Sequence, residues 1–155
     1  MKGNKKITER LNKLLSDELT AVNQYIVQAE ICEKWGHKKF HDDIKKQAID
    51  EMRHAEKLIA RILFLEGMPV VTKLNKINIG KNIEEQFRND CLAESGAIKS
   101  YTESIQLAED SGDRETAELL RSILQDEEKH LQWLETQSEQ LKQVELQNYL
   151  LEQIS

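Results

Sequence analysis

Residues 49–57 read IDEMRHAEK and residues 126–135 read DEEKHLQWLE. Each stretch holds a Glu with a His three residues later, Glu51 with His54 and Glu127 with His130. Residues three apart share one face of a helix, so each pair directs a carboxylate and an imidazole the same way. Both stretches lie in longer runs whose apolar residues recur at steps of three and four, which is typical of amphipathic helices. The two pairs therefore fall on the buried faces of two predicted helices.

The same periodicity predicts an all-α chain. Residues that end helices interrupt this periodicity at four places. These are Gly36, Gly67 to Pro69, Gly80 and Ser111-Gly112-Asp113. Between these breaks we expect helices over 5–35, 39–66, 83–110 and 113–142, with a short fifth helix over 146–153. Four long amphipathic helices bury their apolar stripes together as a bundle, so we expect one domain over residues 1–155.

The lengths of the connections predict the topology. The short links at Gly36 and Gly112 make antiparallel hairpins of helices one and two and of helices three and four. The connector over 67–82 can reach about 50 Å, whereas a 28-residue helix is about 42 Å long. It can therefore cross the whole bundle, which makes helices two and three parallel. We expect its apolar residues to pack on the bundle: Val70, Val71, Leu74, Ile77 and Ile79.

Composition excludes several classes of function. The formal charge of −6, from 22 Lys and Arg against 28 Asp and Glu, opposes binding to nucleic acid. A mean hydropathy of −0.64 and the lack of a long apolar run exclude a membrane span. The basic start runs into polar residues rather than the apolar stretch of a signal peptide, so we expect a cytoplasmic protein. The two cysteines form no C-x-x-C motif, and we expect both to be buried thiols.

Four carboxylates interrupt the apolar stripes. Glu18, Glu51, Glu94 and Glu127 fall on core positions near the middle of four different helices. Burying an unpaired carboxylate costs several kcal/mol, and four together repel one another. The stripes offer no Lys or Arg at these positions, so the positive charge must come from outside the chain. A pair of metal ions supplies it.

A shift of 76 residues relates the two halves of this arrangement. It takes Glu18 to Glu94, Glu51 to Glu127 and His54 to His130 (94 − 18 = 127 − 51 = 130 − 54 = 76). The same shift relates three further pairs: Tyr25 and Tyr101, Gly36 and Gly112, Asp50 and Asp126. The sequence thus predicts two hairpins of one design, related by a pseudo-two-fold axis through the site.

Two Glu-x-x-His helices with one Glu from each of two others resemble the ferritin-like di-metal carboxylate bundles. Over nearly its whole length the chain resembles bacterioferritin. The motifs that carry this resemblance are MKGN, LNKLLSDEL, IDEMRHAEK, ILFLEGMP, INIG, DEEKHLQWLE and LQNYL. It implies a ferritin-like fold with one long crossover, a hollow 24-subunit shell with the short last helix at the four-fold axes, and ferric mineral inside. A bacterioferritin-associated ferredoxin would assist iron release.

The resemblance also implies a role for each residue. Glu51 and Glu127 would bridge two iron ions, Glu18 and Glu94 would be terminal ligands, and His54 and His130 would give one nitrogen to each ion. Ferroxidase activity with O2 or H2O2 follows, because a metal pair can deliver two electrons together. Tyr25 is a candidate electron donor in this reaction.

Met52 would bind a haem b shared between two subunits, each giving one Met. Met52 points about 100° away from Glu51, onto a second apolar stripe with Ile49, Ile59 and Leu63. Helix one has a comparable stripe at Leu15, Leu19, Val22 and Ile26, and two apolar faces on one helix indicate a partner subunit.

One position departs from the family pattern. Lys46 occupies the place of a His that often binds iron with Asp50 on the inner surface, so an iron site there is doubtful. Two alternatives remain open, a haem-free ferritin and a metal-free structural or DNA-protecting cage protein. The acidic charge disfavours DNA binding.

Overall fold

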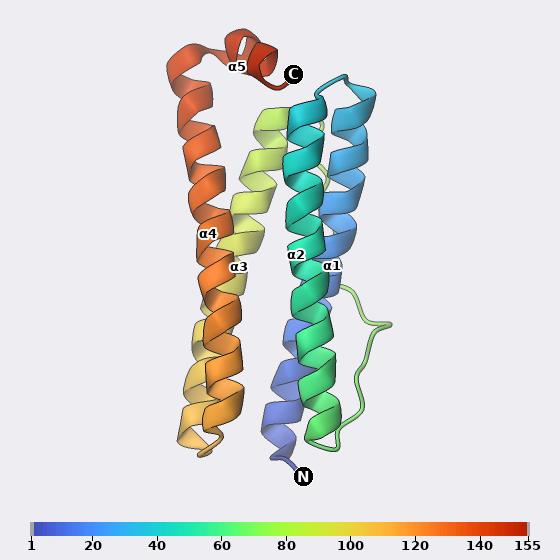
Figure 1. Cartoon of the computed structure of the whole chain (residues 1–155), viewed down its shortest axis with the longest axis vertical. Helices are drawn as coiled ribbons and strands as arrows, with labels where there is room; N and C mark the ends of the chain where they lie inside the picture. The colour runs from blue at the N-terminus through green and yellow to red at the C-terminus, as the bar shows by residue number, and fades with distance from the viewer. Residues whose placement is uncertain (1, 155) are drawn as a thin grey trace.

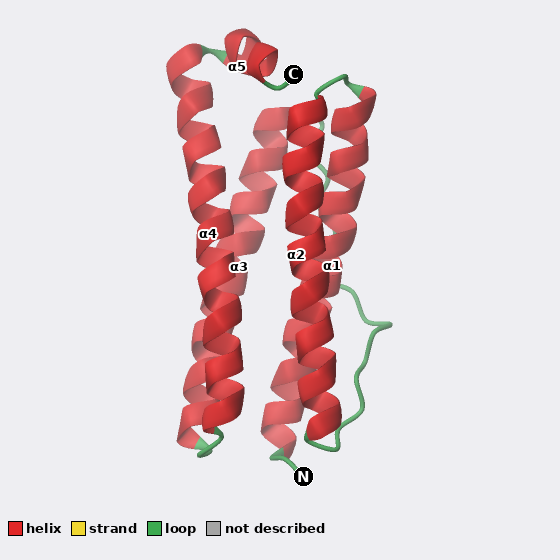
Figure 2. Ribbon diagram, in the orientation of Figure 1, coloured by secondary structure: helices red, strands yellow, loops and turns green. Residues whose placement is uncertain are grey.

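The computed structural model describes residues 2–154, so Met1 of the MKGN motif and Ser155 lie outside the described residues. Its elements are five α-helices: α1 (Lys5–Lys34), α2 (Lys38–Phe64), α3 (Ile83–Asp110), α4 (Arg114–Val144) and α5 (Leu146–Glu152). Over residues 2–154 there is no β-strand, as the ribbon in Figure 2 makes plain. The four long helices form a bundle, which confirms the predicted fold class (Figure 1).

Both hairpin links end their first helix in the same way. Gly36 has φ of 83° and Gly112 has φ of 77°, a left-handed conformation that favours glycine. After α1, the His37 N–H donates to the Cys32 carbonyl and the Gly36 N–H donates to the Glu33 carbonyl. The equivalent bonds follow α3, so both links are Schellman motifs. They turn the chain sharply, and α1 packs along α2 while α3 packs along α4.

The crossover over residues 65–82 runs up the outside of the bundle beside α1, so that α2 and α3 are parallel (Figure 1). Polar side chains of α1 hold it there. The Asn12 side chain donates to the Met68 carbonyl and accepts from Val70 N–H, Thr20 Oγ1 accepts from Asn75 N–H, and Gln24 Oε1 accepts from Asn78 N–H.

The expectation that the apolar residues of the crossover pack on the bundle is wrong. Val70, Val71, Leu74 and Ile79 are exposed and Ile77 is half-buried. The crossover is fixed through its backbone, and backbone bonds to α1 leave these side chains free to face outward.

The apolar core is divided into two parts. One cluster includes Leu11, Leu58 and Leu120 near the end of the bundle that holds the N-terminus. The other includes Phe40 and Phe87 and lies towards α5. The buried carboxylates and imidazoles fall between them along the helices, so the polar layer is closed off by apolar side chains at both ends.

The short helix α5 lies across one end of the bundle (Figure 1). Tyr149 is 2% exposed, packs against Phe87 with the two rings nearly perpendicular and donates a hydrogen bond to Gln137 Oε1. The Lys39 N–H donates to the Gln153 carbonyl, which ties the end of α5 to the start of α2. None of the helices in the described residues has the length and apolar character that crossing a bilayer requires.

Two smaller expectations also differ from the structure. Leu15, assigned to the outer stripe, is fully buried in the core. Cys32 is buried, but Cys91 is only partly so.

Candidate metal centre

The six predicted ligands meet inside the bundle. Glu18 comes from α1, Glu51 and His54 from α2, Glu94 from α3, and Glu127 and His130 from α4. Each of the four carboxylates is 1–2% exposed, His54 is 1% exposed and His130 is 7% exposed. Their donor atoms form two compact groups: Glu18, Glu51, His54 and Glu127, and then Glu51, Glu94, Glu127 and His130. Glu51 and Glu127 belong to both groups.

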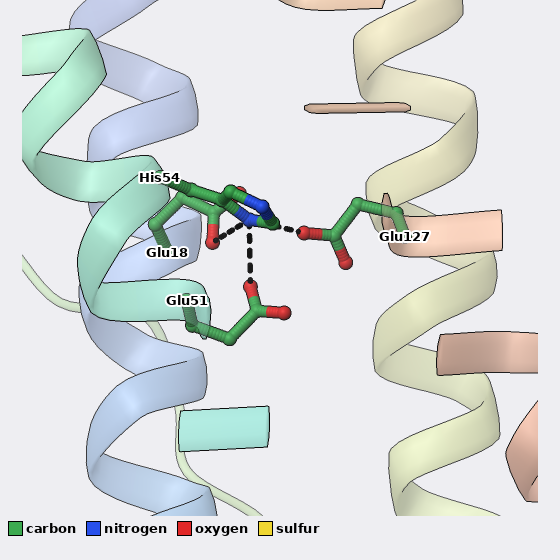
Figure 3. A group of neighbouring side chains, drawn as sticks. All are labelled: Glu18, Glu51, His54 and Glu127. Carbon is green, nitrogen blue, oxygen red and sulfur yellow. Dashed lines mark ion pairs between the residues drawn. The ribbon is translucent and has the colours of Figure 1, made fainter. Parts of the chain in front are cut away.

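In the first group, three carboxylates surround one imidazole nitrogen (Figure 3). His54 Nδ1 lies 2.9 Å from Glu127 Oε1, 3.6 Å from Glu18 Oε2 and 3.8 Å from Glu51 Oε2. Glu18 and Glu51 approach from the α1–α2 hairpin, whereas Glu127 reaches across from α4. The group therefore joins the two hairpins.

The second group repeats this geometry with the hairpins exchanged. His130 Nδ1 lies 2.8 Å from Glu51 Oε1, 3.6 Å from Glu94 Oε1 and 3.9 Å from Glu127 Oε2. The 76-residue repeat in the sequence therefore corresponds to two donor groups with similar distances around their imidazoles.

These donor atoms have no hydrogen-bond partner. Among the described residues, the buried unpartnered atoms include one from each ligand: Glu18 Oε2, Glu51 Oε1, His54 Nδ1, Glu94 Oε2, Glu127 Oε1 and His130 Nδ1. They lie close together yet are not aligned for hydrogen bonds. Buried polar atoms are nearly always hydrogen-bonded, so six such atoms without a hydrogen bond in one place favour an additional partner.

The spacing of the atoms identifies that partner. Two N or O ligands each about 2.1 Å from one cation lie about 3.0 Å apart at a right angle and about 3.4 Å apart at a tetrahedral angle. The separations from each His Nδ1 to its carboxylates, 2.8–3.9 Å, cover this range. Carboxylates with one imidazole per ion suit Fe(II), Mn(II) or Zn(II). The donor set therefore fits two divalent ions.

The outer nitrogen of each imidazole is held by an Asp from the opposite hairpin. His54 Nε2 lies 2.9 Å from Asp126 Oδ2, and His130 Nε2 lies 3.1 Å from Asp50 Oδ2. A carboxylate on the far nitrogen fixes the ring and turns the near nitrogen towards a metal. This role is not predicted from the sequence, although the 76-residue shift pairs Asp50 with Asp126.

Two tyrosines form hydrogen bonds with Glu18 and Glu94, the carboxylates that each belong to only one donor group. Tyr25 OH donates to Glu94 Oε1 and Tyr101 OH donates to Glu18 Oε1, each at 2.5 Å. Such short bonds are typical of a hydroxyl on a carboxylate. Burial, with the nearby carboxylates, raises the pKa of both phenols well above the usual value. Both therefore remain protonated donors.

Burial and the neighbouring charges alter the pKa values of the side chains at this centre. Burial and the neighbouring carboxylates raise the pKa of Glu18 and of Glu127. Burial lowers the pKa of His54, but Glu18 and Glu51 outweigh it and raise that pKa to about 10. For His130, Glu51 and Glu94 likewise outweigh burial and raise the pKa to about 11. The imidazoles and two of the carboxylates therefore bind protons more tightly at this centre than they do in water.

Met52 lies about 100° around α2 from Glu51 and is 41% exposed. Ile49 and Leu63 on the same helix, and Ile26 on α1, are also exposed. The predicted outer apolar stripe is thus present on the single chain, without Leu15.

Lys46 and Lys129 line a pocket of about 300 Å³ together with Asp50, Asp126 and His130. This pocket adjoins the centre on the α2–α4 side. The two ammonium groups oppose the binding of a further divalent cation there.

Comparison with known proteins places the chain in a family. The family model of the ferritin-like domain matches residues 8–144. Bacterioferritin from Rhodobacter capsulatus is 42% identical over 137 residues, which is 88% of this chain and 85% of that protein. The chain belongs to the bacterioferritin family. Bacterioferritin from Brucella melitensis is 38% identical, over 96% of this chain and 92% of the relative. That of Mycolicibacterium paratuberculosis is 35% identical over 100% of this chain and 98% of its own length.

Proposed function

We propose that this chain is an iron-storage protein that oxidises Fe(II) at the buried centre and holds the product as ferric mineral. The observation that carries the proposal is the set of six buried donor atoms that lack a hydrogen bond and are spaced as ligands of shared cations. Membership of the bacterioferritin family supports iron as the metal.

Each ligand has a role that its position supports. Glu51 and Glu127, which belong to both donor groups, would bridge two ions. Glu18 and His54 would complete one site, and Glu94 and His130 would complete the other. Four carboxylates and two divalent ions balance in charge, which makes the buried cluster tolerable. Two ferrous ions held together supply two electrons at once to O2 or H2O2.

The protein side of the reaction follows from the surroundings. Asp126 and Asp50 orient the imidazoles, and the apolar clusters on either side limit water in the bundle. Tyr25 is bonded to Glu94 and is a candidate electron donor during oxidation. Each donor group contains Glu51 from α2 and Glu127 from α4, so metal binding would also hold the two hairpins together.

We further propose the assembly that the family implies, a cytoplasmic 24-subunit shell built from two-fold dimers, with mineral inside. Met52 of each subunit would bind one haem b at the dimer interface, because a symmetric contact repeats the same patch on both partners. The exposed stripe around Met52 fits one half of such a site. Iron release would use this haem together with a bacterioferritin-associated ferredoxin.

Stopped-flow oxidation of Fe(II) by the metal-free protein tests the proposal. We expect a fast phase that saturates at two Fe(II) per subunit and is absent from Glu127→Gln, while Glu128→Gln on the exposed face of α4 keeps it. A fast phase that survives Glu127→Gln would refute the assigned site. A Soret band in the purified protein separates the haem-containing form from a haem-free ferritin.

A further inference from the structure

Tyr101 occupies the position on α3 that Tyr25 occupies on α1. Both side chains are 0% exposed, and each donates a 2.5 Å hydrogen bond to a terminal carboxylate of the centre. The residues are 76 positions apart, as are the two carboxylates that accept from them (101 − 25 = 94 − 18 = 76). The two phenols are therefore placed alike and could take part in the same reaction at the centre.

Each tyrosine is one carboxylate away from the metal position. Glu18 Oε1 accepts from Tyr101, while Glu18 Oε2 has no hydrogen bond and lies 3.6 Å from His54 Nδ1. Glu94 differs in one respect, because its Oε1 accepts from Tyr25 and also lies 3.6 Å from His130 Nδ1, while its Oε2 has no hydrogen bond. A phenol in this position can lose an electron to the centre while its proton passes to the carboxylate oxygen it already contacts.

The reduction of O2 to water needs more electrons than two iron ions provide. Two Fe(II) ions supply two electrons, which reduce O2 only to H2O2, whereas reduction to water needs four. A third iron ion beside Asp50 is a poor source of the missing electrons, because Lys46 and Lys129 line that pocket. Two buried phenols supply the number required.

We propose that Tyr101 is a second one-electron donor, so that Tyr101 and Tyr25 together allow one subunit to reduce O2 to water without releasing H2O2. The inference rests on the proposed ferroxidase function.

The reaction balances. Two Fe(II) become Fe(III), two phenols become phenoxyl radicals and release two protons, and two further protons come from solvent. With four electrons and four protons, the O–O bond breaks and both oxygen atoms leave as water. Each radical is then reduced by one further Fe(II) and takes up a proton. The sum is 4 Fe(II) + O2 + 4 H⁺ giving 4 Fe(III) + 2 H2O.

The test compares wild type with Tyr25→Phe, Tyr101→Phe and the double variant. Tyr149→Phe is the matched control, since Tyr149 is also buried but bonds to Gln137 near α5. Metal-free protein is loaded anaerobically with two Fe(II) per subunit, mixed with O2 and freeze-quenched for electron paramagnetic resonance. Released H2O2 is measured in parallel, and anaerobic Co(II) titration reports whether the ligands still bind metal.

We expect radicals in wild type and Tyr149→Phe, and in each single variant the radical of the remaining tyrosine. The double variant should lose the signal and release one H2O2 for each O2 consumed, with Co(II) affinity unchanged. A Tyr101→Phe variant with the wild-type radical and H2O2 yields overturns the inference. Weaker Co(II) binding with unchanged radical yield also overturns it, because Tyr101 would then only orient Glu18. If wild type binds Fe(II) but does not oxidise it, the proposed function itself fails, and the inference with it.

Discussion

Replacing Glu51 by Gln should weaken both metal sites at once, whereas replacing Glu18 by Gln should weaken only one. Glu51 belongs to both donor groups and Glu18 to the first alone. Removing one partner of a buried, compensated charge costs about 3–5 kcal/mol. At about 1.4 kcal/mol per tenfold change, affinity falls by about two to four orders of magnitude at each affected site.

Anaerobic titration with Co(II), followed by visible absorption and calorimetry, measures this difference directly. We expect two tight ions per subunit in wild type, one tight and one weak ion in Glu18→Gln, and no tight ion in Glu51→Gln. Glu56→Gln, on the exposed face of α2, is the control and should match wild type. If Glu51→Gln kept one site of wild-type affinity, the two groups would not share this carboxylate and the reasoning would be refuted.

Three further predictions follow from the same geometry. Asp126→Asn should lower Co(II) affinity about 10–100-fold by freeing the His54 ring, and an unchanged affinity would show that this bond is incidental. Because the metal-free pKa is about 10 for His54 and about 11 for His130, both rings are protonated at pH 7 and must lose protons to bind metal. Binding should thus release protons and weaken as pH falls, which calorimetry in buffers of different ionisation enthalpy checks; heats independent of the buffer would contradict it. Met52→Leu should abolish the Soret band while leaving Fe(II) oxidation intact, and full haem occupancy in this variant would show that Met52 is not the ligand.

The bundle and the meeting of the six ligands could be predicted because both depend on helical periodicity. A Glu at a core position of an amphipathic stripe is visible in the sequence, and its distance along the helix fixes its height in the bundle. The hydrogen bonds of Asp126 and Tyr101 were not predicted, since they depend on contacts between hairpins. The repeat contained the signal for both, as each residue has a partner 76 positions away.

The crossover shows where such patterns mislead. Val70, Val71 and Leu74 are apolar and were expected to be buried, but the segment has no periodicity that relates it to a neighbouring face. Its position is set by polar groups of Asn12 and Gln24 on α1, which bond to the crossover backbone. Hydrogen bonds from side chains to the backbone are hard to predict from sequence. Every residue except Pro has a backbone N–H, so the crossover residues that form such bonds need no particular side chain.

A crystal of the protein soaked anaerobically in Fe(II), with anomalous scattering recorded at the iron absorption edge, tests the shared metal site most directly. We expect two peaks per subunit about 3.5–4 Å apart, both between the carboxylates of Glu51 and Glu127. Iron found only on the surface, or a single peak bound by one hairpin alone, would contradict a site shared by the two hairpins.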